Sequence, residues 1–136
     1  SLQIGVAELD AAVRDYQTFL SQPGERRGVL HRFPLQRGAV ELTVGEPGVR
    51  SLRFRREASD ADPPPDWNGI RVVLDAREEE EVPPPPPAVP HAIDHVVVQS
   101  PDLDRAVALW RDRAGIRLAL DRDFPQRGLR ILFFRS

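Results

Sequence analysis

The chain has 136 residues, 40% of them hydrophobic, with a formal net charge of −2 and an isoelectric point near 5.9. This length suits one ordinary domain or two small half-domains with a packed core, and the weakly acidic balance disfavours nucleic acid or an anionic membrane surface as a partner. The absence of cysteine excludes disulfides, thiolate metal sites and a cysteine nucleophile, so a bound metal would need His, Asp or Glu ligands.

The chain contains no apolar run of membrane-spanning length and no signal peptide, so we expect a soluble cytoplasmic protein. Methionine is absent even at position 1, which suggests an excised, processed or incompletely recorded version of a longer chain, or one with residues missing internally.

The first expected elements are a short strand in "LQIGVA" and an amphipathic helix over Glu8 to Leu20. An apolar stripe at helical spacing supports the helix; it consists of Leu9, Val13, Tyr16 and Leu20.

Four strands are expected next, over Val29 to Phe33, Ala39 to Val44, Val49 to Arg55 and Ile70 to Leu74. In "AVELTV" the apolar side chains alternate with Glu41 and Thr43, which is typical of a half-buried strand. The turn signals "QRG" and "GEPG" separate the strands.

The stretch "EEEEVPPPPPAVP" is incompatible with a helix interior or a central strand, because proline lacks the backbone N–H and fixes φ. We interpret residues 78–92 as an acidic, proline-rich linker whose four carboxylates, Glu78 to Glu81, are solvated. A ligand for a proline-reading domain is the alternative.

Beyond the linker, "IDHVVVQ" predicts a strand and Asp102 to Ala114 a helix. Ser100 is the expected cap, with Pro101 in the first turn and Gly115 at the C-terminal stop. Two more strands are expected, over Ile116 to Leu120 and Leu129 to Phe134.

The two expected helices form a sequence repeat. "ELDAAVRDYQTFL" aligns with "DLDRAVALWRDRA" at an offset of about 94 residues, so that Tyr16 matches Trp110. The order of elements predicts an α+β fold of mostly antiparallel sheets with helices on one face.

The run "AIDHVVVQSPDLDRAVALW" resembles the opening of a module in the vicinal oxygen chelate superfamily, which includes glyoxalases, bleomycin-resistance proteins and extradiol dioxygenases. "LQIGVAELDAAVRDYQTFL" is similar but weaker, and "GAVELTVGEPGVRSLRF" looks like the join between two modules. The resemblance implies repeated βαβββ modules that form curved sheets around a small-molecule site, with helices on the outer face.

The resemblance also implies domain boundaries. Residues 1–77 would be a glyoxalase-like module pair, and residues 93–136 the start of a further module. The second module of the pair is degraded, because "EASDADPPPDW" replaces its helix. The alternative is that the unit at 93–136 packs directly against the first unit.

Family enzymes hold a divalent metal such as Zn, Fe, Mn or Ni with His and Glu from the first and last strands of each module. The resemblance implies that His95 and Glu41 are metal ligands. The alternatives are a hydrogen-bonded histidine at the sheet edge and a carboxylate on the solvent face of a strand. Ser1 and Ser51 occupy the other equivalent positions, and serine is a poor ligand for these metals.

Other residues have weaker functional interpretations. His31 is expected on a strand face, and His91 in solvent. The basic run Arg53, Arg55 and Arg56 is either a clamp for an anionic substrate or a solvated strand face. Aromatic walls of a ligand site, or core packing, are the two interpretations of Trp67, Trp110 and Phe133.

The resemblance therefore implies a divalent-metal-dependent lyase, isomerase or dioxygenase acting on a small oxygenated molecule, with catalytic residues unassigned. The alternative is a metal-free small-molecule-binding protein that serves resistance or sequestration. A pseudo-enzyme or dimerisation module is a third option. The resemblance also allows a homodimer, since family members often complete their sheets by pairing chains, and it leaves the oligomeric state open.

Overall fold

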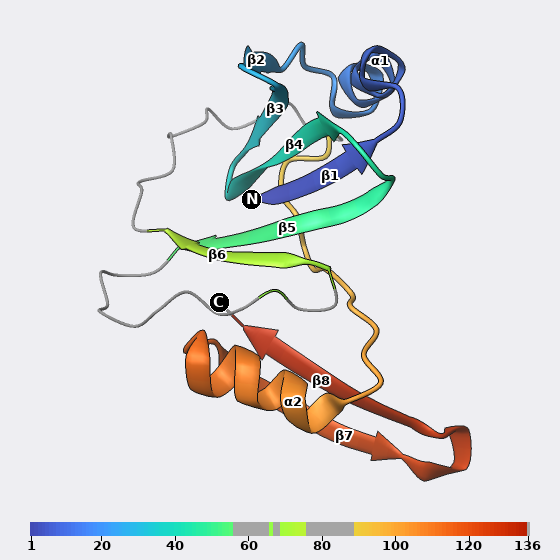
Figure 1. Cartoon of the computed structure of the whole chain (residues 1–136), viewed down its shortest axis with the longest axis vertical. Helices are drawn as coiled ribbons and strands as arrows, with labels where there is room; N and C mark the ends of the chain where they lie inside the picture. The colour runs from blue at the N-terminus through green and yellow to red at the C-terminus, as the bar shows by residue number, and fades with distance from the viewer. Residues whose placement is uncertain (56–65, 67–68, 76–88, 136) are drawn as a thin grey trace.

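A computed structural model describes residues 1–55, 66, 69–75 and 89–135. It has an α+β fold with one six-stranded mixed sheet, in the order β2-β3-β4-β1-β5-β6, and a separate two-stranded sheet, β7-β8 (Figure 1). The strands are β1 (Leu2–Val6), β2 (Glu25–Arg27), β3 (Leu30–Leu35), β4 (Gly38–Val44), β5 (Gly48–Arg55), β6 (Arg71–Asp75), β7 (Arg117–Phe124) and β8 (Leu129–Arg135). The helices are α1 (Leu9–Leu20), α2 (Leu103–Val107), a π-helical continuation over Ala108–Arg113 and a 3₁₀ turn at Pro125–Arg127.

The sheet is mixed because β1 pairs in parallel with β4, and β5 in parallel with β6. All other pairings are antiparallel, including β1 with β5 at the centre. The expected α+β class is confirmed, although the sheet contains two parallel pairings that the sequence pattern did not predict.

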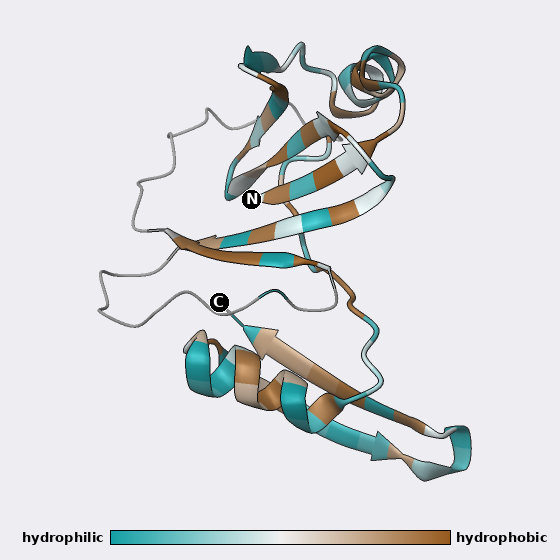
Figure 2. Ribbon diagram, in the orientation of Figure 1, coloured by the Kyte–Doolittle hydropathy of each residue, from teal (hydrophilic) through white to brown (hydrophobic). Residues whose placement is uncertain are grey.

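Both long helical segments pack on the same face of the six-stranded sheet. The cluster under α1 contains Val40 and Leu42 of β4, and the cluster under α2 contains Leu52 of β5. Leu2 lies opposite both Val40 and Leu52 in the register, so these side chains share one face. Figure 2 shows the corresponding alternation of apolar and polar residues along the strands.

The apolar stripe of α1 is confirmed. Leu20 of the helix is buried, and the rest of the stripe packs against Phe33 and Leu42, which are both fully buried. The β3–β4 hairpin that supplies these residues turns through Gln36 and Arg37, and the Gln36 N–H donates to the carbonyl of His91 at 2.9 Å. Pro34 lies in β3 opposite Ala39, beyond the end of β2.

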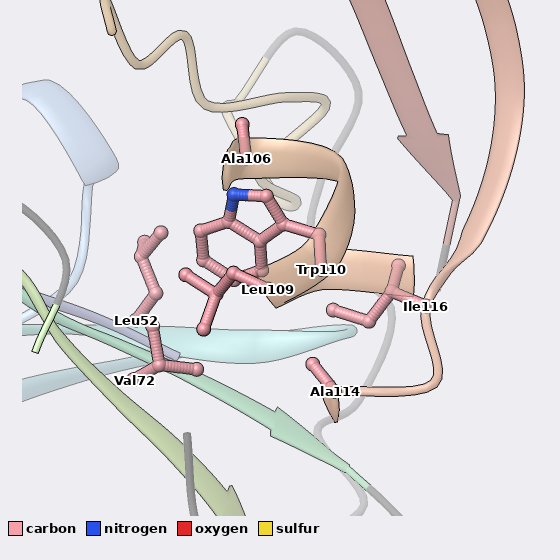
Figure 3. Packing of buried hydrophobic residues seen from close by; sticks show 7 residues of the cluster. All are labelled: Leu52, Val72, Ala106, Leu109, Trp110, Ala114 and Ile116. Carbon is pink, nitrogen blue, oxygen red and sulfur yellow. The ribbon is translucent and has the colours of Figure 1, made fainter. Parts of the chain in front are cut away.

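Trp110 is the centre of the cluster under α2 (Figure 3). The residue is 8% exposed, and its ring meets Phe54 of β5 edge-to-face at 5.7 Å and lies 6.4 Å from the ring of Phe134 of β8. This cluster joins α2 to β5 and β6, so residues beyond the linker share a core with residues before it.

Several expected elements differ from the structure. Residues 93–99 belong to no strand, since Val96 and Val97 are 37% and 78% exposed and have no partner strand among the described residues. The short strand β2 was not expected from the sequence, because its residues, "ERR", show no alternation of apolar and polar side chains. Asp102, rather than Ser100, caps α2: its carboxylate accepts from the Arg105 N–H at 2.9 Å.

The second half of the expected helix at 102–114 is π-helical. The Ala114 N–H donates to the Leu109 carbonyl at 2.8 Å, a five-residue step. The wider turn lets Leu109 and Ala114 face the same core, which a regular α-helix would separate. Gly115 ends the helix with φ of +66°, as expected.

Nowhere in the described part of the chain does a helix have the length and apolar content needed to cross a bilayer.

Candidate functional site

The face of the six-stranded sheet opposite α1 and α2 carries an unbroken row of polar residues, one on each strand. We call this the polar face and the row the polar row. Each member lies opposite the next in the strand register: Glu25, Arg32, Glu41, Gln3, Ser51 and Arg71. Neighbouring strands lie about 5 Å apart, so the row spans roughly 24 Å.

The half of the row on β2, β3 and β4 is internally paired. An Arg32 guanidinium N–H donates to Glu41 Oε1 at 2.7 Å, and these side chains are only 13% and 9% exposed. Arg32 Nε lies 3.8 Å from Glu25 Oε1, which also pairs with Arg27 at 2.7 Å. Positive and negative charges alternate here, so this half presents little net charge.

The centre of the row is neutral. The Ser51 hydroxyl donates to the side-chain oxygen of Gln3 at 3.1 Å, which ties β5 to β1 on the polar face. The carbonyl oxygen of Gln3 is thus occupied, and its amide N–H group is directed away from Ser51.

A β-bulge changes which side chains reach this face. The β1–β5 register shifts between Gln3 and Ile4, so Arg50 is the extra residue on β5. The Arg50 side chain lies over Gly5, where Cγ and Cδ are each 3.1 Å from the place a Cβ would occupy. Arg50 also pairs with Glu46 at 3.4 Å. Glycine is needed at position 5 chiefly because a Cβ there would clash with the backbone carbonyl oxygen of Glu46, and it also leaves room for the Arg50 side chain.

Glu41, one of the two predicted metal ligands, lies on β4 in the polar row. It is 7% exposed overall, whereas the alternative interpretation was an exposed carboxylate on a solvent face. Its Oε1 accepts from Arg32, so the carboxylate already has a cationic partner.

His95, the other predicted ligand, lies away from Glu41. Residues flanking it pack against the helix-bearing face, Ile93 against the cluster under α1 and Val98 against the cluster under α2. The sheet therefore separates His95 from the polar face. The His95 side chain is 66% exposed, and its Nδ1 lies 2.7 Å from a carboxylate oxygen of Asp94.

The described residues do not fit a shared metal centre. They contain no group of three or more His, Asp or Glu side chains placed to hold one ion. The nearest polar neighbours of Glu41 in the row are the amide of Gln3 and the guanidinium of Arg32, which supply one neutral donor and one repelling cation. Ser1 lies outside the row, where its amino group donates to the Arg53 carbonyl at 2.8 Å.

The remaining histidines have structural contacts. The His31 ring lies beside the Phe33 ring, tilted by 41° with 4.9 Å between centroids, and its Nε2 lies 3.0 Å from the Pro23 carbonyl oxygen, on the helix-bearing face. His91 is exposed, as expected, and its Nδ1 lies 3.1 Å from the Val89 carbonyl. An open cavity of about 670 Å³ lies between the β3–β4 turn and the segment 89–94.

The aromatic candidates divide between core and surface. Trp110 is a core residue, whereas Phe133 is 52% exposed on the outer side of the β7–β8 hairpin. Trp67, Arg56 and Glu78 to Glu81 lie outside the described residues, as do most of the linker and the side chain of Arg55. Arg53 lies on the polar face, two residues along β5 from Ser51.

Four members of the row were not identified from the sequence: Gln3, Glu25, Arg32 and Arg71. Alternation in "LHRFPL" separates Arg32 from Phe33 and Leu35, and alternation in "LQIGV" separates Gln3 from Leu2 and Ile4. Those patterns predict on which face of a strand each residue lies, but they do not predict which strands are neighbours in the sheet. The row could not be predicted, because it depends on the order of the strands.

Comparisons with protein-family models, with curated proteins and with solved structures found no match.

Proposed function

We propose that this chain is a small-molecule-binding protein of the glyoxalase, bleomycin-resistance and dioxygenase type, and that it binds its ligand on the polar face without a metal. The polar row carries the proposal. The row aligns polar side chains on six adjacent strands, includes a largely buried carboxylate, and offers hydrogen bonds at regular spacing to a flat or extended ligand.

The arrangement of elements supports the family resemblance. Residues 2–44 run strand, helix and three strands, which is the order of the module. The two central strands, β1 and β5, each have a parallel neighbour on their outer side. The neighbour of β1 is β4, and the neighbour of β5 is β6. Helix α2 covers this second half as α1 covers the first, and the hairpin β7–β8 follows it as β2–β3 follows α1. In this interpretation the site lies where the two halves meet, at Gln3 and Ser51.

The state of Glu41 favours binding over metal chemistry. A ligating carboxylate needs its oxygens for the metal, and Arg32 occupies one of them through a short, largely buried ion pair. With Glu41 paired to Arg32, the side chains of the polar row would bind a ligand as hydrogen-bond donors and acceptors held in fixed positions.

The test is a thermal-shift screen of small oxygenated molecules against wild type and Gln3→Leu, with Gln126→Leu as the control on an exposed turn. A ligand at 100 times its Kd should stabilise the wild type by about 2.7 kcal/mol. The shift should disappear in Gln3→Leu and persist in Gln126→Leu. Hits that stabilise all three proteins equally would place the site elsewhere and overturn the proposal.

The metal-dependent lyase, isomerase or dioxygenase is the competing proposal, supported by the position of Glu41 on the last strand of the first unit. Metal content after purification without chelator separates the two. About one equivalent of metal that is lost in both Glu41→Gln and His95→Ala would replace the metal-free proposal.

A further inference from the structure

We infer that the polar face takes ligands through an anionic group, a carboxylate or a phosphate, held beside Arg71 and Ser51. This inference rests on the proposed function and specifies the chemistry of the ligand at the same site. It comes from the uneven distribution of charge along the face.

The two halves of the polar face differ in charge. Over β2, β3 and β4, the described cations Arg27 and Arg32 are matched by two carboxylates, Glu25 and Glu41. Over β5 and β6, the described ionisable side chains are those of Arg50, Arg53 and Arg71. Arg55 and Asp75, two residues of opposite charge, lie opposite each other at the far end of the same two strands. The β4–β5 turn contributes one carboxylate, Glu46, which pairs with Arg50. Since Arg50 pairs with Glu46 and Arg53 has contacts of its own, Arg71 is the described cation of this half that is left for a ligand.

Arg71 is the group best placed to bind a ligand anion. It is exposed at the end of the row, and within the described part of the chain no carboxylate pairs with it. A guanidinium has five donors in a planar fork that matches a carboxylate or phosphate. Arg53 lies on the same face, about 7 Å along β5 from Ser51, but it has contacts of its own, so the anion is assigned to Arg71.

The neighbours of Arg71 continue this donor pattern toward the centre. Ser51 lies directly beside it on β5, and Gln3 follows on β1. Because the Gln3 oxygen accepts from Ser51, the amide N–H group of Gln3 is the part left for a ligand. An anion at Arg71 would place the rest of a small molecule over Ser51 and Gln3, roughly 5–10 Å away.

The experiment uses three matched aromatic probes, benzoate, phenyl phosphate and benzamide, titrated into isotope-labelled protein and followed by amide chemical shifts. Benzoate or phenyl phosphate should shift the amides of Ser51, Leu52 and Arg71 with a Kd at least about tenfold below that of neutral benzamide. The tighter of the two anions distinguishes a carboxylate ligand from a phosphate ligand.

The variant Arg71→Gln should weaken binding of the preferred anion about tenfold or more and leave benzamide binding unchanged, whereas the charge-matched control Arg127→Gln should leave both unchanged. Equal affinity for benzamide, equal losses in the two variants, or shifts confined to other surfaces would overturn the anion inference. The proposed function would survive such a result, since it is decided separately by Gln3→Leu in the screen of oxygenated molecules.

Discussion

The two halves of the molecule are built from similar elements but held together differently. In the half around α1, one continuous segment, residues 2–44, forms four neighbouring strands of a single sheet. In the half around α2, β5 and β6 come from before the linker, and the helix and hairpin come from after it. The β7–β8 hairpin has no strand pairing with the larger sheet among the described residues (Figure 1).

This difference shows that side-chain contacts hold the β7–β8 hairpin and α2 in place where strand pairing with the larger sheet is absent among the described residues. The first half is joined by β-ladders, and its core contains the fully buried Phe33 and Leu42. The second half depends on side chains that meet around Trp110, with Arg130 of β8 bonded to Asp121 of β7 and Asp104 of α2 at 2.7–2.8 Å. A few large side-chain contacts therefore attach α2 and the β7–β8 hairpin to the sheet, whereas β5 and β6 of the same half are joined to it by β-ladders.

The largest expected effect follows from that dependence. We expect Trp110→Ala to lower the free energy of unfolding by about 4 kcal/mol, because the cavity it leaves lies at the only large contact between hairpin, helix and β5 in the described chain. Hydrogen exchange should show loss of protection in β7 and β8 while β3 and β4 retain theirs. Tyr16→Ala, the matched change under α1, should cost less, because Tyr16 is only partly buried. Equal loss of hydrogen-exchange protection in both halves would contradict the view that the hairpin and α2 depend on Trp110 while the strands around α1 do not.

The next effect concerns the buried ion pair of the first half. Arg32→Met leaves the Glu41 carboxylate buried without its cation, and we expect a loss of about 3 kcal/mol in urea denaturation. The double variant Arg32→Met, Glu41→Leu should recover most of that loss. A double variant as unstable as the single one would mean that Glu41 is stabilised by groups other than Arg32.

A smaller effect is expected at the start of α2. Asp102→Ala removes the carboxylate that accepts from the Arg105 N–H, and the loss should be about 1 kcal/mol by chemical denaturation. Asp102→Asn is the control, because asparagine caps about as well. Equal losses in the two variants would show that the charge, and not the cap, stabilises the helix end.

The smallest effect is a pH dependence of the hairpin. Hydrogen bonds from Arg130 lower the pKa of Asp121 below its ordinary value. A lowered pKa adds stability above the pKa of the unfolded chain, and that stability is lost as the pH falls through the pKa of the folded state. Titration followed by carboxyl chemical shifts should find a lowered pKa for Asp121 in wild type and an ordinary one in Arg130→Gln. An unchanged pKa in the variant would assign the shift to another cause. The pair is solvent-exposed, so the effect on stability should be slight.

Much of the fold was predictable because its elements are locally amphipathic. The stripe through Val13 and Tyr16 identified α1, and the alternation around Glu41 identified β4. Residues 93–99 have an equally strong strand pattern, yet they remain unpaired. Strand formation needs backbone pairing with a neighbour as well as local alternation, and the sequence pattern reports only the alternation.

The site was less predictable than the fold for the same reason. Glu41 was identified on the correct strand, but its cation, Arg32, lies nine residues earlier and meets it only through the β3–β4 register. The place of His95 was inferred from alternation in a strand that does not form. The bulge that brings Arg50 to the polar face depends on the pairing of β1 with β5, which no local pattern reports.

The proline in β3 makes the two borders of the larger sheet unequal. Since Leu35 and Gly38 close a two-residue turn, the backbone nitrogen of Pro34 faces outward, past the end of β2, where it has no hydrogen to donate. The carbonyl of Pro34 is also taken, by the Gln22 side chain at 3.0 Å. An incoming chain would find few backbone groups to bond at that border. Among the strands that the structure describes, β6 forms the other border, and extension of the sheet by a further strand is therefore expected there, next to the proposed anion site.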